Sequence, residues 1–181
     1  MFNHVIRTFV FGSQLANKAK HSYDVELMYV VSVLHDLGLV ESYISTGARF
    51  EIDGANAARG FAIKQGYSPE QAQTIWTAIA LHTSEGIASE MPEIALVHFG
   101  AGVDVGGIGF DQLTARQINE ILEAYPRLGF KRAIAEAFLK MAHKKPTTAT
   151  WNFTADFLTR SSPEIQLPNF CDIIAAAPFQ D

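Results

Sequence analysis

Residues 25–37 (VELMYVVSVLHDL) would be apolar on nearly every side if they formed a helix, and this property constrains the fold more than any other. A helix of that kind must be covered by other elements. Residues 5–20 and several later segments carry apolar side chains at helical spacing, with short breaks between them, and few segments alternate as strands do. We therefore predict an all-α fold, a single helical bundle wrapped round residues 25–37.

Proline, glycine and capping residues predict where the helices begin and end. Ser22 or Asp24 is expected to cap the helix of residues 25–37, and Gly38 to end it in a left-handed conformation. We predict one domain over residues 1–181, with a core at about 3–146 and a C-terminal helix and irregular surface tail at 147–181. The other expected helices are 5–20, Asp53 or Asn56 to Gln65, Pro69 to Leu81, Pro92 to Val103, Thr114 or Ala115 to just before Pro126, Lys131 to His143, and a short one within 150–160.

The overall charge and the apolar runs exclude two classes of partner. The net charge is -5 and no dense Lys/Arg cluster occurs, which argues against a nucleic-acid groove. No apolar stretch approaches the roughly 20 residues of a membrane span. No secretion signal opens the chain, and the single cysteine, Cys171, excludes an intramolecular disulfide. We expect a soluble, cytoplasmic protein that acts on a small molecule.

The adjacent His35 and Asp36 interrupt the end of the apolar segment. Burying an ionised carboxylate without a partner costs several kcal/mol, so the pair needs a hydrogen-bonded network or a metal. A buried histidine taken alone is more often a core residue than a ligand. Three further side chains on other expected helices, His4, His82 and Asp104, are of the types that bind Zn, Mn, Fe, Co or Ni.

Several motifs together carry a resemblance to a known superfamily. They are NHVIRTFVFG (3–12), VLHDLGL (33–39), RFEIDGANAA (49–58), IALHTS (79–84), GVDVGG (102–107) and YPRLGFK (125–131). The chain resembles the HD superfamily, and within it the cyanamide hydratase-like branch more closely, over about residues 3–146. The resemblance implies that His4, His35, Asp36 and Asp104 bind one divalent ion, with Zn first and Fe, Mn, Co or Ni as alternatives.

Two points about this ligand set follow from the residues. His35 and Asp36 are about 100° apart on a helix, so they can meet one ion only where the helix ends. His21 also precedes the pair, but it lies in a polar break (KAKHSYD), whereas His4 opens a helix that also carries Arg7. Only three residues precede His4, so a longer N-terminus or a partner subunit, as in a homodimer, is expected to cover that side.

The resemblance implies an enzyme, a metal-dependent hydratase or hydrolase that activates water. For hydration of a nitrile-type substrate such as cyanamide, giving urea, Asp36 would accept a proton and His82 would protonate the nitrogen. The alternative is hydrolysis of a phosphate ester or nucleotide, for which several cationic side chains are expected near the ligands. Only Arg7 lies within a turn of a ligand, with Arg49 and Arg116 available from loops. A non-catalytic protein that keeps the metal as a structural pin or a sensor is the third interpretation.

For several other polar residues the sequence leaves two alternative roles. Arg7 either serves the catalytic site, by orienting Asp36 or by binding an anionic substrate, or forms a buried ion pair. His82 either points into the cavity or caps its helix. Glu51 and Asp53 either lie near the pocket or stabilise the first turn of a helix, and the second role is favoured. The remaining histidines expected to be structural or exposed are His98 and His143.

Overall fold

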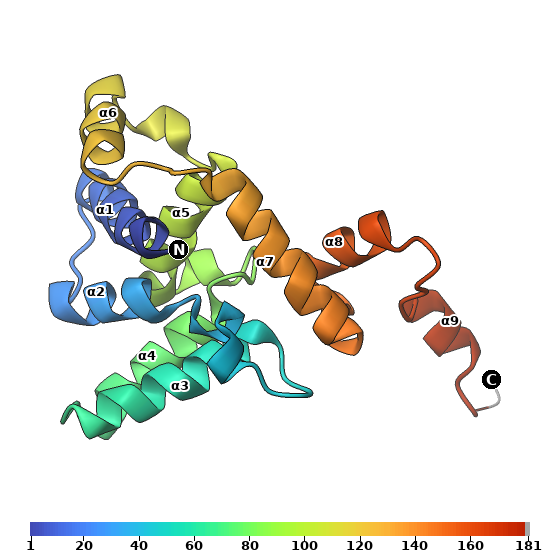
Figure 1. Ribbon diagram of the computed structural model, residues 1–181. Helices are drawn as coiled ribbons and strands as arrows, with labels where there is room; N and C mark the ends of the chain where they lie inside the picture. Colours follow the sequence, from blue (N-terminus) through green and yellow to red (C-terminus); the bar gives the residue numbers. More distant parts are fainter. Residues whose placement is uncertain (180–181) are drawn as a thin grey trace. The chain divides into compact units, whose positions relative to one another are not determined.

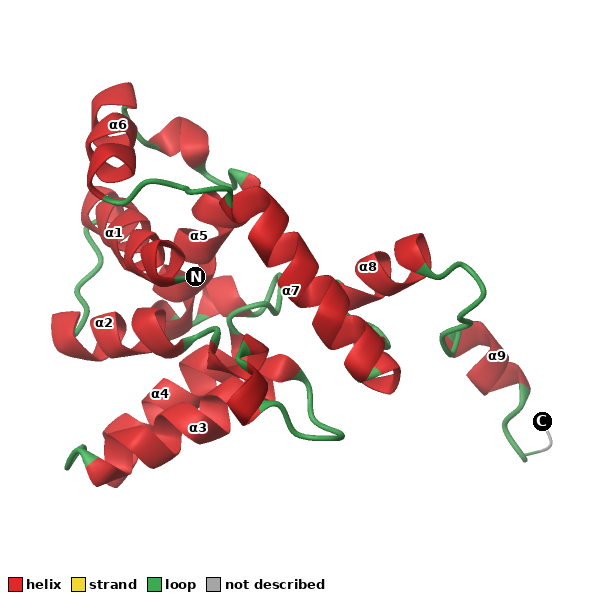
Figure 2. Ribbon diagram, viewed as in Figure 1, coloured by secondary structure: helices red, strands yellow, loops and turns green. Residues whose placement is uncertain are grey.

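The computed structural model describes residues 1–179, and within that part all regular secondary structure is helical, with no strand (Figures 1 and 2). The all-α prediction is therefore confirmed. None of the described helices combines the length and the apolar character that a bilayer crossing requires. The α-helices are α1 (Phe2–Ala19), α2 (Val25–Leu34), α3 (Phe50–Lys64), α4 (Pro69–Leu81), α5 (Pro92–Gly106), α6 (Ala115–Ala124), α7 (Phe130–Lys144), α8 (Thr154–Ser161) and α9 (Phe170–Ala175).

The described chain divides into two compact units, the first of which is Met1–Ile134. In this unit α1 packs along α5 and α3 packs along α4, and α2 contacts all four of these helices (Figure 1). This arrangement agrees with the prediction that the bundle wraps round the apolar second helix. The core of the unit is formed mainly by small and aliphatic side chains, among them Met28, Val31, Ile75, Ile79, Ile94 and Val97.

Side-chain caps fix several helix starts where the sequence predicted them. Of the two candidates before α2, Asp24 is the cap, because its Oδ1 accepts a hydrogen bond from the backbone N–H of Leu27 at 2.9 Å. Ser68 and Gln71 form a reciprocal capping box at the start of α4, ahead of the proline at its first position. Thr114 and Gln117 repeat the same box at the start of α6.

The end of α2 differs from the prediction, and the difference matters for the site. This helix stops at Leu34, and a 3-10 turn over Leu37–Leu39 follows it. Gly38 is not left-handed, so that expectation was wrong. Its lack of a side chain serves a close approach instead, because a Cβ at this position would collide with the backbone carbonyl oxygen of Phe50 on α3. Helix α3 accordingly starts at Phe50, earlier than predicted.

The second unit begins at Ala135, within α7. Its apolar centre is small and consists of Ala142, Ala149 and Leu158, with Ile165 and Leu167 packed against them. The tail that was predicted to be irregular contains a short helix, α9, which Asn169 caps by accepting a hydrogen bond from the N–H of Cys171. The predicted short helix within residues 150–160 is present as α8.

Candidate metal centre

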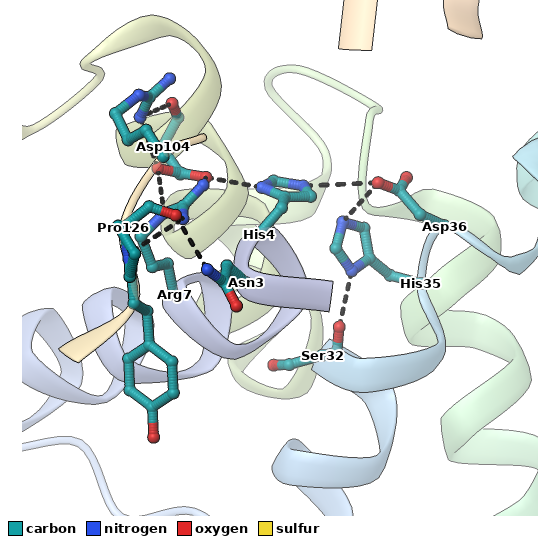
Figure 3. Close-up of polar contacts among 10 residues, drawn as sticks. Asn3, His4, Arg7, Ser32, His35, Asp36, Asp104 and Pro126 are labelled. Carbon is teal, nitrogen blue, oxygen red and sulfur yellow. Dashed lines mark hydrogen bonds and ion pairs between the residues drawn. The ribbon is translucent and has the colours of Figure 1, made fainter. Parts of the chain in front are cut away.

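Three buried side chains from two helical segments of the first unit bring potential ligand atoms together. One donor atom each from His4, His35 and Asp36 lies within 4.8 Å of the other two. Asp36 Oδ2 is 3.3 Å from His4 Nε2 and 3.4 Å from His35 Nε2, so the carboxylate oxygen lies between the two imidazoles (Figure 3). They are three of the four residues that the resemblance predicted as metal ligands.

The local backbone explains how neighbouring residues can face one point. His4 lies in the first turn of α1, whereas His35 is the residue directly after α2 and Asp36 precedes the following 3-10 turn. Because the α-helical geometry ends between Leu34 and Asp36, the two adjacent side chains are freed from their usual separation of about 100°. The early end of α2 is therefore part of how the site is built.

Both imidazoles are held so that Nε2 faces Asp36. His35 Nδ1 donates a hydrogen bond to the backbone carbonyl of Ser32 at 2.7 Å, and His4 Nδ1 donates one to Asp104 Oδ2 at 2.7 Å. A carbonyl or carboxylate oxygen can only accept, so the proton of each neutral ring is on Nδ1 and the lone pair is on Nε2. Outer hydrogen bonds of this kind orient histidine ligands in metal sites.

The pKa shifts of His35 and Asp36 favour the neutral imidazole and the ionised carboxylate that metal ligands need, whereas the shift of His4 favours the protonated ring. Burial lowers the pKa of His35 to about 4, with a further contribution from the neighbouring His82 and His4, so His35 is neutral at pH 7. Burial raises the pKa of Asp36, but the adjacent histidines outweigh it, and the net pKa lies well below its usual range. Burial lowers the pKa of His4, and its contacts with Asp104 and Asp36 reverse this to a net rise.

Asp36 Oδ2 is a buried carboxylate oxygen that lacks a hydrogen-bond donor in the described part of the chain. A buried anionic oxygen that faces two nitrogen lone pairs is unfavourable unless a cation lies among them. Two imidazole nitrogens and one carboxylate oxygen suit Zn, Fe, Mn, Co or Ni, and disfavour an oxygen-only Ca or Mg site. The residues present therefore fit a divalent transition-metal ion.

Asp104, the fourth predicted ligand, lies on the opposite edge of the His4 ring (Figure 3). Its Oδ2 accepts from His4 Nδ1 and from Arg7 Nη2, and its Oδ1 accepts from Arg7 Nε and Arg127 Nη1, over 2.6–2.8 Å. A carboxylate offers about four lone-pair directions, and these contacts occupy all of them. The structure thus places Asp104 behind His4 and outside the three-donor group.

Arg7 forms the buried ion pair that was one of its predicted roles. Its guanidinium is completely buried, and it donates both to Asp104 and to the backbone carbonyls of Tyr125 and Pro126. Burial raises the pKa of the Asp104 carboxyl, but the hydrogen bonds from His4 and Arg7 outweigh it and hold the pKa below its usual range. Arg7 is directed to Asp104 and not to Asp36.

Two functional neighbours of the site, Arg127 and Phe130, were missed in the sequence although both lie in the quoted motif YPRLGFK. Arg127 Nη1 donates to Asp104 Oδ1 at 2.6 Å and to the Asp104 backbone carbonyl at 2.9 Å. The Phe130 ring stacks on His4 with centroids 4.4 Å apart, and the guanidinium carbons of Arg7 and Arg127 lie 5.3 and 5.1 Å from the Phe130 centroid. The motif was the only signal that could have found them.

His82 lies beside the three-donor group and not within it. It directly follows α4, its ring centroid is 5.0 Å from that of His35, and its Nδ1 donates to the backbone carbonyl of Ile79 at 2.6 Å. The backbone carbonyl of His82 in turn accepts from His98 Nδ1 at 2.7 Å. His98 therefore has a structural role, and His82 keeps its Nε2 for other contacts.

The remaining candidates have partners outside the three-donor group. Glu51 is buried, its Oε1 accepts from Thr83 Oγ1 at 2.5 Å and from Arg49 Nη2 at 2.9 Å, and its Oε2 has no hydrogen-bond partner in the described chain. Asp53 Oδ2 accepts from the backbone N–H of Ser45 at 2.9 Å. The candidates with exposed side chains are Arg116, which pairs with Glu120, His143, which contacts Ser161, and His21, in the break after α1.

Comparison with known proteins gives one finding that bears on this site. Residues 1–121 match the family described as HD domain, which is more than half of the chain and includes the three donors and Asp104. No curated protein matches the chain.

Proposed function

Because this chain belongs to the HD domain family, whose members are in general metal-dependent hydrolases, we propose that it binds one divalent cation through His4, His35 and Asp36 and activates water for attack on a small molecule. The observation that carries the proposal is the buried Asp36 Oδ2 without a hydrogen bond, between two histidine nitrogens. The chemistry that a divalent cation supplies at such a site is a water whose pKa is lowered toward neutrality. Zn is our first choice of ion.

The chain's own residues can move the protons that this chemistry requires. We assign Asp36, the carboxylate of the three-donor group, the acceptance of a proton from water. His82 donates its Nδ1–H to the Ile79 carbonyl, so Nε2 is the ring nitrogen that is left for a reacting group. We assign His82 the delivery of a proton to the atom that becomes negative during the reaction.

The first candidate substrate is a nitrile-type molecule such as cyanamide. The support for it is the set of motifs that resembles the cyanamide hydratase-like branch of the superfamily. In this reaction water adds to the electrophilic carbon, Asp36 accepts the water proton, and His82 protonates the nitrogen, so that cyanamide gives urea.

Hydrolysis of a small phosphate ester is a second candidate, and Arg127 is the specific observation that favours it. The sequence offered only Arg7, Arg49 and Arg116 as cations for such a substrate. Arg49 pairs with Glu51 and Arg116 pairs with Glu120 on the surface, whereas Arg127 joins the site through Asp104. A cation placed there could neutralise phosphoryl oxygens.

The first test combines metal analysis with two activity assays. The parent protein is expected to hold about one transition-metal ion per chain, and to release either urea from cyanamide or phosphate from a panel of nucleotides and sugar phosphates. His35→Ala should lose both the metal and the activity. His143→Ala, which changes an exposed histidine, should lose neither. Equal metal content in the parent and His35→Ala would reject the proposed centre.

His82→Ala tests the proton-transfer role separately. The variant should keep its metal because His82 lies outside the three-donor group, while turnover should fall by about 10²–10⁴-fold. Unchanged turnover would return His82 to a structural role.

A further inference from the structure

We propose that a cleft beside His4 binds an oxyanion group of the substrate, a phosphate or a carboxylate, through the free edge of Arg127. The cleft has a volume of about 210 Å³, lies wholly in the first unit, and is lined by His4, Arg7, Arg127 and Phe130 among others. We call it the Arg127 cleft. The role in substrate binding rests on the proposed function with a substrate that carries an oxyanion group, as a phosphate ester does and cyanamide does not, but the binding itself can be measured without metal or turnover.

The charges at the wall of the Arg127 cleft do not balance. Two guanidinium groups, of Arg7 and Arg127, are paired with the single carboxylate of Asp104. One positive charge therefore remains uncompensated among these three residues. Electrostatic attraction favours an anion at such a position, and it is stronger where the surroundings are only partly hydrated.

The donors of the two arginines differ in availability. Arg7 is buried, and its Nε, Nη1 and Nη2 all donate to Asp104 or to backbone carbonyls. Arg127 donates only through Nη1, and its Nε and Nη2 have no hydrogen-bond partner in the described chain, while its side chain is 30% exposed. Nε and Nη2 form the edge of a guanidinium that binds two oxygens of a phosphate or a carboxylate at once.

Arg127 is held in place before any anion arrives. The residue between Arg127 and Gly129, Leu128, has a left-handed φ of 48° although its side chain is 83% exposed and gains little from packing. That conformation costs an L-residue roughly 1–2 kcal/mol. The backbone carbonyl of Pro126, which precedes Arg127, accepts hydrogen bonds from Asn3 and Arg7. The Arg127 guanidinium lies over the Phe130 ring. A preformed site loses less conformational entropy when it binds.

The size of the cleft restricts the ligand to a small group. Pockets for drug-sized molecules span about 300–1,000 Å³, and the Arg127 cleft is smaller than this range. It has room for one phosphate or carboxylate group. Inorganic phosphate and acetate are therefore suitable probes, and the stronger binder of the two identifies the group.

The test is calorimetric titration of phosphate and of acetate into the full chain, first stripped of metal and then loaded. Arg127→Gln should weaken binding of the preferred anion by about 10-fold or more, since a hydrogen bond to a charged group is lost. Arg116→Gln is the matched control, because it removes the same charge from an exposed arginine, 86% exposed, on α6. This control should bind the anion as the parent does.

Any other outcome would reject anion binding in the Arg127 cleft. No saturable binding of either anion by the parent, or equal binding by the parent and Arg127→Gln, would overturn the proposal. If phosphate binds only to the metal-loaded protein, and Arg127→Gln does not weaken that binding, the phosphate is bound by the metal. This result would contradict anion binding in the Arg127 cleft and would leave the proposed function intact. If Arg127→Gln fails to fold, Leu128→Asp places a negative charge at the rim, keeps all partners of Asp104, and should weaken binding as well.

Discussion

At the scale of single residues, the site depends on which edge of each imidazole is occupied. His4, His35 and His82 all donate from Nδ1 to an oxygen, and His4 differs in that its acceptor is a carboxylate. Asp104 would therefore orient His4 toward a cation bound at Nε2, while the two arginines keep the charge of Asp104 compensated. This arrangement suits an orienting residue more than a ligand.

Asp104→Asn separates these two roles. The amide keeps the shape of the side chain but cannot accept all the hydrogen bonds of the carboxylate, so His4 should be less well oriented. Metal affinity should fall by about 10–100-fold, with binding still complete at saturating metal in a competition assay. Asp111→Asn, at an exposed position, is the control. A complete loss of metal at saturation would identify Asp104 as the fourth ligand that the sequence predicted.

The lowered pKa of His35 predicts how acid affects the metal-free protein. The unfolded state takes up a proton near pH 6.5, whereas folded His35 does so only near pH 4. The unfolded state therefore binds more protons between these values, and stability falls as the pH is lowered through this window, by up to about 3 kcal/mol from this group. Urea unfolding at a series of pH values measures this fall in the free energy of unfolding.

A variant isolates this effect from that of His4, whose raised pKa acts in the opposite direction and stabilises the fold at low pH. His35→Gln should remove the His35 contribution, so its stability should fall less than that of the parent between pH 6.5 and 4. His143→Gln should follow the parent. Parallel curves for the parent and His35→Gln would show that His35 titrates normally in the folded protein.

At the scale of helices, close backbone approaches position the candidate metal ligands. A Cβ on Gly100 of α5 would collide with the backbone carbonyl oxygen of Thr8 on α1, so these helices can be this close only because residue 100 has no side chain. The same crossing brings Asp104 of α5 to His4 of α1. The contact between α1 and α5 is thus a structural requirement of the site.

Gly100→Ala should separate the two helices and lower the free energy of unfolding by about 1–3 kcal/mol or more, as overpacking does. It should also weaken metal binding. Gly60→Ala is a matched control in α3, because a Cβ there meets no atom within 4 Å. That substitution should raise stability by about 0.5–1 kcal/mol. Equal effects of the two substitutions in urea unfolding would contradict the close approach.

At the scale of the whole molecule, the centre joins the beginning of the chain to the segment that follows α2. A cation bound to His4, His35 and Asp36 stabilises the folded state only, because the three donors are brought together by folding. Metal at 100 times its Kd adds about 2.7 kcal/mol to the free energy of unfolding.

The homodimer that was expected to cover the His4 side of the site stays a prediction.

Metal addition should therefore raise the Tm of the stripped parent by about 5–10 °C for a chain of this size. A chelator should reverse the rise, and His35→Ala should show little change under the same conditions. Scanning calorimetry measures these Tm values. An equal rise in the Tm of His35→Ala would place the stabilising ion elsewhere in the molecule.

The sequence by itself determined the features that depend on neighbouring residues. Helical periodicity and local capping residues, such as Ser22 or Asp24 before α2, predicted where helices form, because apolar spacing and cap hydrogen bonds involve residues within a few positions of each other. The motifs also singled out His4, His35 and Asp36, which the structure brings together.

Only the tertiary structure decided what surrounds those donors. The contacts of Asp104 with His4 and Arg7 span 100 and 97 residues, and its contact with Arg127 spans 23. Spacing along a chain does not show which oxygen meets which nitrogen, so the occupied carboxylate and the free edge of Arg127 could not be predicted. The approach of Gly38 to Phe50 likewise arises from packing between segments, which overrode the left-handed stop that local preference favoured.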